Sequence, residues 1–163
     1  MIGTDTLGRS RELDIELAYG QHMPWLRRRL ALLTGDPDEA EDLAHQAFVR
    51  AIERWPGGSR DEAARWLATV GIRLAIDELR RRRRWGWLRL HETQATWAFQ
   101  ADPDLWQALA TLAPEHRAAL LLTVLDGYTQ EEAAQILGVP RGTIASWLSR
   151  ARSRLRSVIG EED

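Results

Sequence analysis

The 163-residue sequence contains no cysteine, no lysine and no asparagine. Without cysteine the chain can form no disulfide, no thiolate metal site and no cysteine nucleophile. It also has no apolar run of about 18 residues, the length expected of a segment that spans a membrane. Its first residues, MIGTDTLGRSRELD, are polar and acidic, which is unlike a secretory signal. These absences predict a cytoplasmic protein with no membrane contact of its own.

Residues that could carry out catalysis or bind a metal are also sparse. The four histidines are scattered, and although Glu41 lies four residues before His45, they form no visible metal or triad constellation: His22, His45, His91 and His116. The acids of GDPDEAED, residues 35–42, lack the spacing of a calcium loop, and no Gly-rich phosphate loop is present. We therefore expect no metal site, no cofactor and no catalytic residue, and a protein that is not an enzyme.

Two basic blocks lie within an acidic chain. All 22 basic residues are arginine, a bias that the codon usage of a GC-rich genome explains, and the formal net charge is −2. Residues 72–90 hold 7 arginines against 2 acids, and residues 140–157 hold 5 arginines and no acid. The intervening residues 91–139 hold 1 arginine against 7 acids. A polyanionic partner would therefore meet the two basic blocks rather than the whole surface.

The pattern of apolar residues predicts an all-α fold. Runs of β-branched residues with a period of two are missing, and apolar residues recur at helical spacing. Pro24 is expected to open or kink a helix. Between about residues 86 and 102 the periodicity fades, which indicates a linker. Helices are predicted at residues 10–20, 24–33, 37–55, 61–84, 103–112, 114–126, 130–137 and 140–156.

Each predicted helix has an apolar face that should pack inward. The residues expected on these faces are Leu26, Leu30 and Leu33, then Ala44, Phe48, Ile52 and Trp55, then Leu67, Val70 and Leu74, then Leu105, Leu109 and Leu112, and finally Ile144, Leu148, Ala151 and Leu155.

Five consecutive arginines, residues 80–84, end the long predicted helix and are followed by Trp85 and Trp87. Cations favour a helix C-terminus, but five exceed what a cap needs, and we expect no nearby acid to relieve their repulsion. They should therefore face water or phosphate. The tryptophans suit stacking on an unpaired base or, equally, covering the core where the helix ends.

The stretch YTQEEAAQILGVPRGTIASWLSRARSRLR, residues 128–156, has the pattern of a helix-turn-helix. Thr129 and Glu132 form a capping box, and Gly138 begins the turn before the second helix. Such a second helix enters the major groove, where arginine pairs with guanine. An amphipathic helix with a solvated arginine face remains the alternative.

Taken in order, three segments resemble the extracytoplasmic-function (ECF) group of bacterial sigma factors. HMPWLRRRLALLTGDPDEAEDLAHQAFVRAIERW and WLATVGIRLAIDELRRRRR resemble the stretches of sigma domain two. LATLAPEHRAALLLTVLDGYTQEEAAQILGVPRGTIASWLSRARSRLR resembles the whole of sigma domain four. The resemblance covers residues 19–159. It implies two small helical domains, at residues 1–88 and 103–163, joined by a short linker at residues 89–102.

The resemblance also implies a function. Such a factor binds core RNA polymerase through the clamp coiled coil of the largest subunit and the flap of the second-largest. It directs transcription initiation at promoters by recognising minus-35 and minus-10 elements, and an anti-sigma factor usually restrains it. The acidic segments would then meet the polymerase or fold back against the basic blocks. A stand-alone helix-turn-helix regulator and a sigma mimic that titrates an anti-sigma factor are the alternatives.

Matching positions carry the family's site residues onto this chain. The implied minus-35 contacts are Arg141, Thr143, Ser146, Trp147, Ser149, Arg150 and Arg154. The implied contacts to the duplex and the minus-10 element are Arg73, Asp77, Arg80, Arg81 and Arg84, and the loop that holds a flipped-out base comprises Gly57, Gly58, Ser59 and Arg60. The implied polymerase contacts are Glu41, Asp42, Gln46, Val49, Arg50 and Glu53.

Overall fold

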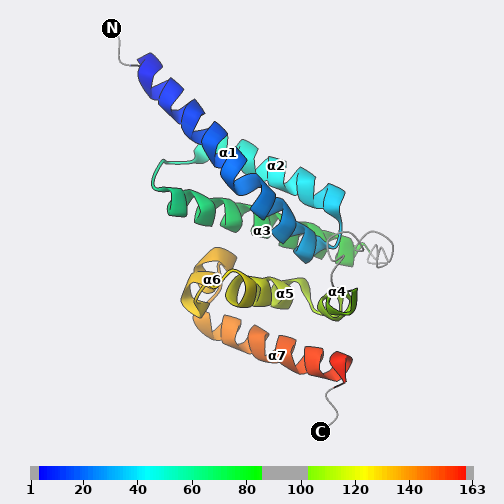
Figure 1. Ribbon diagram of the computed structural model, residues 1–163. Coiled ribbons are helices and arrows are strands. Elements are labelled where there is room, and N and C mark those ends of the chain that lie inside the picture. Colours follow the sequence, from blue (N-terminus) through cyan, green and yellow to red (C-terminus); the bar gives the residue numbers. More distant parts are fainter. Residues whose placement is uncertain (1–3, 86–102, 161–163) are drawn as a thin grey trace.

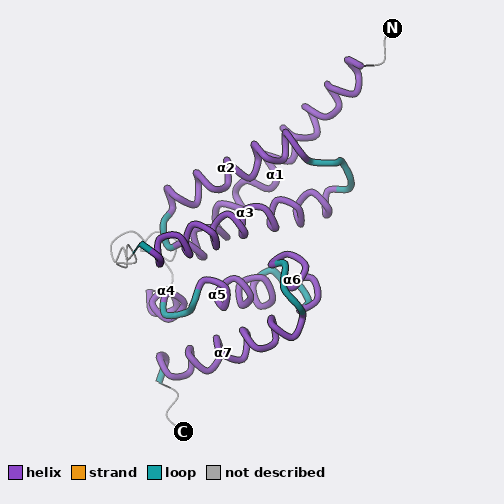
Figure 2. The backbone as a smooth tube through the Cα atoms, turned by 180° about the vertical axis from the view of Figure 1, so that it is seen from behind, coloured by secondary structure: helices purple, strands orange, loops and turns teal. Residues whose placement is uncertain are grey.

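The computed structural model describes residues 4–85 and 103–160, and every regular element in these ranges is a helix, which confirms the all-α prediction (Figures 1 and 2). Residues 4–85, here the first half, contain α1 (Thr4–Thr34), α2 (Pro37–Arg54) and α3 (Arg60–Arg84). Residues 103–160, the second half, contain α4 (Pro103–Ala110), α5 (Pro114–Leu120), the π-helical turn η1 (Leu121–Leu125), α6 (Gln130–Leu137) and α7 (Arg141–Ile159). The predicted linker and Trp87 lie outside the described residues.

The helix α1 corrects the prediction of two separate N-terminal helices, because it continues through Pro24. Proline inside a helix removes a backbone hydrogen bond and normally breaks or kinks it. Here Met23 and Leu26 on either side of the proline are buried, as are Leu30 and Leu33 further along. Burial of this stripe outweighs the local preference of proline, so tertiary packing decides the length of the helix.

Both α2 and α3 begin where capping residues predict. Asp36 accepts hydrogen bonds from the backbone N–H groups of Asp38 and Glu39 at the start of α2. Ser59 and Glu62 form a capping box at the start of α3. The inward face predicted for α2 was partly wrong: Phe48 is buried, but Ile52 is 62% exposed. Ala44 is buried as predicted, and Ala40, Ala47 and Ala51 are buried beside it.

The second half contains the predicted helix-turn-helix. Thr129 and Glu132 form the expected capping box, and Gly138 ends α6 with a φ of 67°. That left-handed conformation favours glycine because it has no Cβ. Ile144, Leu148 and Ala151 are buried and hold α7 against the rest of the second half. The helix-turn-helix geometry is therefore confirmed.

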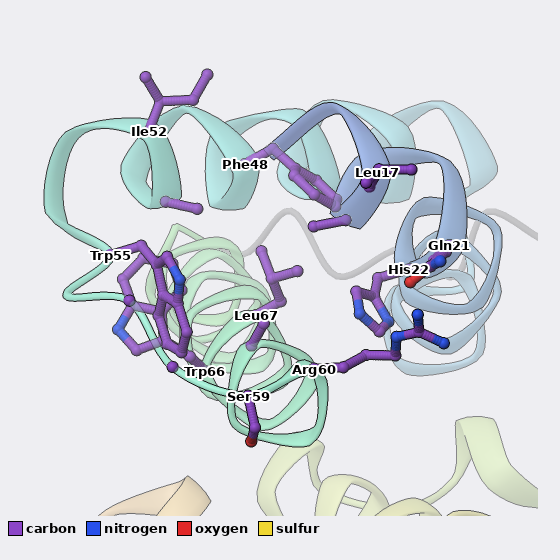
Figure 3. A pocket seen from close by; sticks show the side chains of 15 residues that line it. Leu17, Gln21, His22, Phe48, Ile52, Trp55, Ser59, Arg60, Trp66 and Leu67 are labelled. Atoms are coloured by element: carbon purple, nitrogen blue, oxygen red, sulfur yellow. The ribbon is translucent and has the colours of Figure 1, made fainter. Parts of the chain in front are cut away.

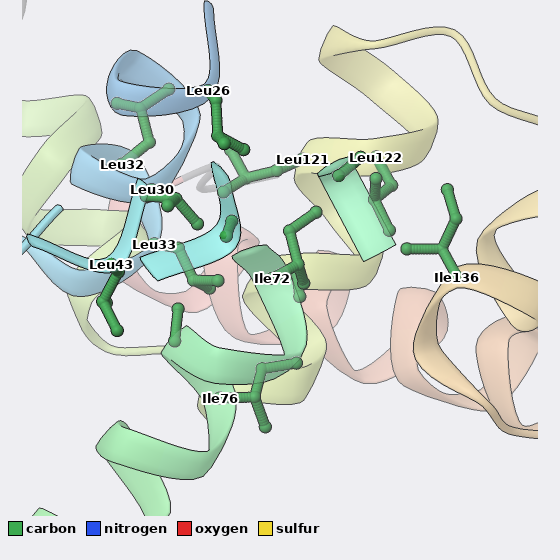
Figure 4. Close-up of a cluster of buried hydrophobic side chains, with 14 of the residues drawn as sticks. Leu26, Leu30, Leu32, Leu33, Leu43, Ile72, Ile76, Leu121, Leu122 and Ile136 are labelled. Atoms are coloured by element: carbon green, nitrogen blue, oxygen red, sulfur yellow. The ribbon is translucent and has the colours of Figure 1, made fainter. Parts of the chain in front are cut away.

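The two halves pack directly on each other. In Figures 1 and 2, α5 and α6 lie between α3 and α7, so that α7 lies on the side remote from the first half. One hydrophobic core runs through both halves and includes Leu26, Leu30 and Ile72 from the first and Leu121, Leu122 and Ile136 from the second (Figure 4). A smaller cluster of Leu109, Leu112 and Ala151 lies within the second half. No described helix is long and apolar enough to cross a membrane.

Candidate nucleic-acid interface

The helix α7 presents most of its polar residues to solvent. Arg141, Ser146, Ser149, Arg150 and Arg154 are exposed, whereas Thr143 is half-buried. None of the five arginines of α7 makes an ion pair with any residue of the described ranges. Exposed cations along a helix, with hydroxyl side chains among them, can contact phosphates and base edges.

Trp147 differs from its predicted neighbours because it also takes part in the packing. Its side chain is half-buried against the core. Its ring lies 6.0 Å from the ring of His116 on α5, measured between centroids. Burial and the nearby Arg150 guanidinium lower the pKa of His116, so this imidazole is uncharged at neutral pH. Trp147 therefore helps to fix α7 on α5, and only the solvent-exposed part of the Trp147 side chain is available to a ligand.

Two of the four arginines predicted to face DNA from α3, Arg73 and Arg80, lie against the second half. Arg73 donates from Nε to the backbone oxygen of Ile136 at 2.9 Å and from Nη2 to that of Gln135 at 3.2 Å. Arg80 donates from Nε to Oε1 of Glu115 at 2.6 Å. Burial, the largest single influence, would raise the pKa of Glu115. The hydrogen bond from Arg80, a backbone hydrogen bond and the charges of Arg80 and Arg83 together outweigh it, so the pKa is lowered. The acidic segments were predicted either to contact the polymerase or to fold back against the basic blocks. In this structure Glu115, which belongs to the acidic segment 91–139, contacts Arg80 of the first basic block.

The expectation that no acid relieves the repulsion within residues 80–84 was wrong. Glu78, one turn earlier, accepts hydrogen bonds from Arg81 at 2.5 Å and from Arg82 at 3.1 Å. Arg82 also pairs with Glu39 of α2. Sequence spacing could have indicated Glu78, because residues three and four apart share a helix face. Within the described ranges, only Arg83 and Arg84 of the run have no ion pair.

We expect Glu39→Gln to stabilise the fold increasingly as the pH rises. Burial raises the pKa of Glu39 to about 7 from 4.5, and the opposing charge of Arg82 compensates only in part. A raised carboxyl pKa means that the folded state prefers the neutral acid, so this preference stabilises the protein at low pH and is lost as the pH rises through about 7. Urea unfolding at about pH 8 should give the variant an advantage of roughly 1 kcal/mol after solvent screening, and at about pH 5 nearly none.

The control for Glu39→Gln is Asp38→Asn, which removes the same charge from the exposed neighbouring position. Its stability difference from the parent should not grow between about pH 5 and 8. A flat difference for Glu39→Gln over that range would show that burial does not keep Glu39 neutral.

The loop between α2 and α3 borders a pocket of about 260 Å³ (Figure 3). Gly57 and Gly58 have φ values of 90° and 148°, and a Cβ on Gly58 would lie 2.7 Å from Oε2 of Glu62. Both glycines are therefore required for the chain to turn into α3. The exposed Ser59 and Arg60 follow, so all four predicted loop residues lie on the rim of this pocket.

The aromatic walls of the pocket were not predicted. Trp55 and Trp66 pack edge to face with ring centroids 5.8 Å apart, and His22 of α1 lies opposite, beside Arg60 (Figure 3). Burial and Arg60 lower the pKa of His22, whose Nε2 is buried without a hydrogen-bond partner. A pocket with such walls could accommodate a ligand that has a flat apolar ring with polar groups along its edge. No signal in the sequence indicated His22 and Trp66, which come from different helices.

The six predicted polymerase contacts lie together on the outer face of α2. All six side chains are exposed, and Val49 is 53% exposed although it is apolar. Asp42 and Gln46 line a surface hollow together with Asp77, Arg81 and Arg84 of α3. The structure thus brings part of the predicted polymerase face next to part of the predicted DNA face. No group of three potential metal ligands occurs in the described ranges.

Trp85 follows the arginine run at the C-cap of α3 and is 68% exposed. It does not cover the core, so the packing alternative predicted for this residue was wrong. An exposed indole beside cations is available for stacking.

Two family descriptions match the chain in the predicted order. "Sigma-70 region 2" matches residues 18–85, and "Sigma-70, region 4" matches residues 103–155. The sigma factor CarQ of Myxococcus xanthus is 30% identical over 154 residues, which cover 88% of this chain and 87% of CarQ. Relatives described as ECF sigma factors match it at 32% identity over more than four fifths of their length. This chain belongs to the ECF group of RNA polymerase sigma factors. The recognition made from the sequence is confirmed.

Other relatives of this ECF-group chain give the same assignment. EcfG of Rhodopseudomonas palustris is 32% identical over 158 residues, covering 86% of this chain and 84% of EcfG. SigE of Mycolicibacterium smegmatis is 30% identical, but this chain spans only 60% of its length. Among solved structures, RpoE of Bartonella quintana, crystallised with the anti-sigma factor NepR, aligns with a TM-score of 0.70 at 26% identity, covering 92% of this chain and 99% of RpoE. SigJ of Mycobacterium tuberculosis shares the fold with a TM-score of 0.60, over 52% of its length.

Proposed function

We propose that this ECF-group protein binds core RNA polymerase and directs it to promoters with minus-35 and minus-10 elements. The observation that carries the proposal is the outer face of α7, where exposed arginines and serines are held in place by a buried apolar stripe. This is the geometry with which the second helix of a helix-turn-helix reads the major groove.

Residue roles follow from the positions described above. The minus-35 element is read from α7 by Arg141, Thr143, Ser146, Ser149, Arg150 and Arg154, and Trp147 sets the position of that helix. The minus-10 element and its flanking duplex are held by Arg73, Asp77, Arg80, Arg81 and Arg84. The clamp coiled coil of the largest polymerase subunit docks on Glu41, Asp42, Gln46, Val49, Arg50 and Glu53, and the second half contacts the flap. These roles correspond to domains at residues 1–88 and 103–163.

The pocket beside the loop gives the minus-10 interaction its chemistry. An unpaired base offers a flat face for Trp55 and Trp66 and a polar edge for Arg60 and the uncharged His22. Stacking of a base on an aromatic side chain contributes about 1–3 kcal/mol, which helps to offset the cost of taking that base out of the duplex. The exposed Trp85 adds a further stacking surface.

Sigma factors are initiation factors without catalytic activity, and for this protein too we propose binding alone, without cofactor or metal. We further propose that it acts in the cytoplasm and that an anti-sigma factor restrains it. The RpoE relative from Bartonella quintana was crystallised with such a partner. The exposed and unpaired arginines of α7 argue against a mimic that never touches DNA.

The decisive test is promoter-dependent transcription in vitro. The full chain is mixed with sigma-free core polymerase from a GC-rich bacterium and a pool of that organism's DNA, and transcript starts are mapped. Starts that share upstream motifs near minus 35 and minus 10 are expected, and they define the promoter used in the experiments below. Binding to DNA without such starts would favour a stand-alone regulator, and the absence of both would favour an anti-sigma titrating mimic.

A further inference from the structure

Three groups that carry or can accept positive charge lie around the first turn of α5. They are Arg83 of α3, His116 of α5 itself and Arg150 of α7. In Figure 1, α5 lies between α3 and α7, so its first turn has one of these helices on either side. Arg83 and Arg150 are exposed, and His116 is half-buried. We call these three side chains the α5 cation cluster.

The end of α3 places Arg83 in this cluster. Arg80 pairs with Glu115, the residue before His116, at 2.6 Å between Nε and Oε1. Arg83 follows Arg80 by three residues and therefore lies on the same face of α3. Burial is the largest influence on the pKa of residues 115–117, and the guanidinium charge of Arg83 acts to lower the pKa of each. Arg83 thus lies beside the first turn of α5.

The packing of α7 places Arg150 on the other side. The ring of His116 lies 6.0 Å from the ring of Trp147, measured between centroids. Arg150 follows Trp147 by three residues and therefore lies on the same face of α7. After burial, the charge of Arg150 is the strongest influence on the pKa of His116. The two guanidinium groups consequently approach His116 from different helices.

The charge of the cluster is balanced only in part. Within the described ranges neither Arg83 nor Arg150 makes an ion pair. The acid that acts on His116 is Glu115, and Glu115 already pairs with Arg80. Like charges held near one another repel, and an anion placed among them relieves that repulsion.

We propose that Arg83, His116 and Arg150 form a binding site for a phosphate group at the first turn of α5. Arginine binds phosphate oxygens as a fork, and an imidazole donates from one nitrogen when neutral and from both when protonated. Free pyrophosphate groups, such as those of nucleotides, and the backbone of DNA offer the same chemistry. The inference goes beyond the proposed function, which gives Arg83 and His116 no role.

Binding of a phosphate group should be coupled to uptake of a proton by His116. In the free protein burial lowers the pKa of His116, and the charges of Arg150 and Arg83 lower it further against the opposing effect of Glu115. A phosphate among these groups adds negative charge, which favours the protonated imidazole and raises this pKa. Because the bound state then holds more protons than the free state, the affinity should rise as the pH falls from about 8 to about 6.

Histidine titration followed by NMR tests the site, because the chain has only four histidines. The signal of His116 is identified by its loss in His116→Gln. Inorganic pyrophosphate, added to the full chain at constant ionic strength, should raise the pKa of His116 by at least about 0.5. The pKa of His22, which lies in the pocket beside the loop, should not change.

A pair of arginine variants tests whether both guanidinium groups contribute. Arg83→Ala with Arg150→Ala should weaken the binding of pyrophosphate, measured by calorimetry, by at least about tenfold. Arg28→Ala with Arg152→Ala removes the same charge from exposed positions that do not act on His116. This control pair should weaken binding by less than about twofold. Equal losses from the two pairs would reduce the site to general attraction of an anion and overturn the proposal.

A mixed-sequence DNA duplex of about 20 base pairs, used as the second probe, distinguishes the two sources of phosphate. A rise in the pKa of His116 with pyrophosphate alone would assign the site to a free phosphate group, and a rise with the duplex alone would assign it to the DNA backbone. If neither probe raises this pKa, the site does not exist. These measurements need no polymerase, so a failure of promoter-dependent transcription would refute the proposed function and leave the phosphate site standing.

Discussion

Replacing Arg117 by methionine should lower the free energy of unfolding by about 3 kcal/mol. Arg117 is only 7% exposed, and burial lowers the pKa of its guanidinium to about 10, which still leaves it charged at neutral pH. It donates to backbone oxygens of Leu33 at 2.5 Å and Leu112 at 3.1 Å. Methionine would fill the space but leave these buried acceptors unpaired, and each such loss costs roughly 1–3 kcal/mol.

Urea unfolding followed by circular dichroism measures the effect of Arg117→Met. Arg152→Met, at an exposed position of α7, is the matched control and should change the stability by less than about 0.5 kcal/mol. Arg117→Lys should not restore the parent stability, because an ammonium group cannot fork onto carbonyls that approach from two elements. A stability of Arg117→Met equal to the parent would show that water replaces the guanidinium at these carbonyls.

Removing two cations from the outer face of α7 should nearly abolish promoter-dependent transcription. Bidentate contacts between arginine and guanine contribute about 1–3 kcal/mol each, so Arg141→Ala with Arg150→Ala should reduce the transcript yield by about a hundredfold at limiting protein. Both side chains are exposed and make no ion pair in the described ranges, so the fold should not lose stability. Yield is measured with core polymerase on the mapped promoter.

Arg152→Ala with Arg156→Ala is the matched control for that pair. It removes the same charge from exposed positions of the same helix that are not proposed to contact bases. Its yield should fall far less, and it should depend less on salt than the yield of the parent, because each lost phosphate contact lowers the salt dependence of binding. An equal loss from the two pairs would mean that α7 contributes only general attraction to DNA. Selection from a random minus-35 library should return a changed motif for Arg150→Ala alone.

Local signals in the sequence predicted the helices well and failed where distant residues decide. The capping box at Thr129 depends on spacing within one turn, so the start of α6 followed from the sequence. Pro24 predicted a break that the structure does not have, because burial on either side of it holds α1 together. Ile52 has helical spacing with Phe48, yet alanines on a neighbouring stripe of α2 form the contact with α1 and α3.

The same division applies to the candidate site. The residues of α7 that face solvent could be assigned from the helical period and the arginine content alone. The partners of Arg73, Arg80 and Arg117 could not, because they lie 63, 35 and 84 residues away along the chain. The pocket walls likewise come from α1, α2 and α3, and no spacing rule connects His22 to Trp55 and Trp66.

By itself, the sequence determined the all-helical architecture, the helix-turn-helix and the family, because each depends on patterns within a few turns of helix or on motifs in a fixed order. Only the tertiary structure decided that the two halves share one core and that the second half holds Arg65, Arg73 and Arg80 of α3. Those contacts arise when apolar faces of separate helices come together and leave helix-end carbonyls and carboxylates beside guanidinium groups. Their energy depends on distances between segments that no local pattern encodes.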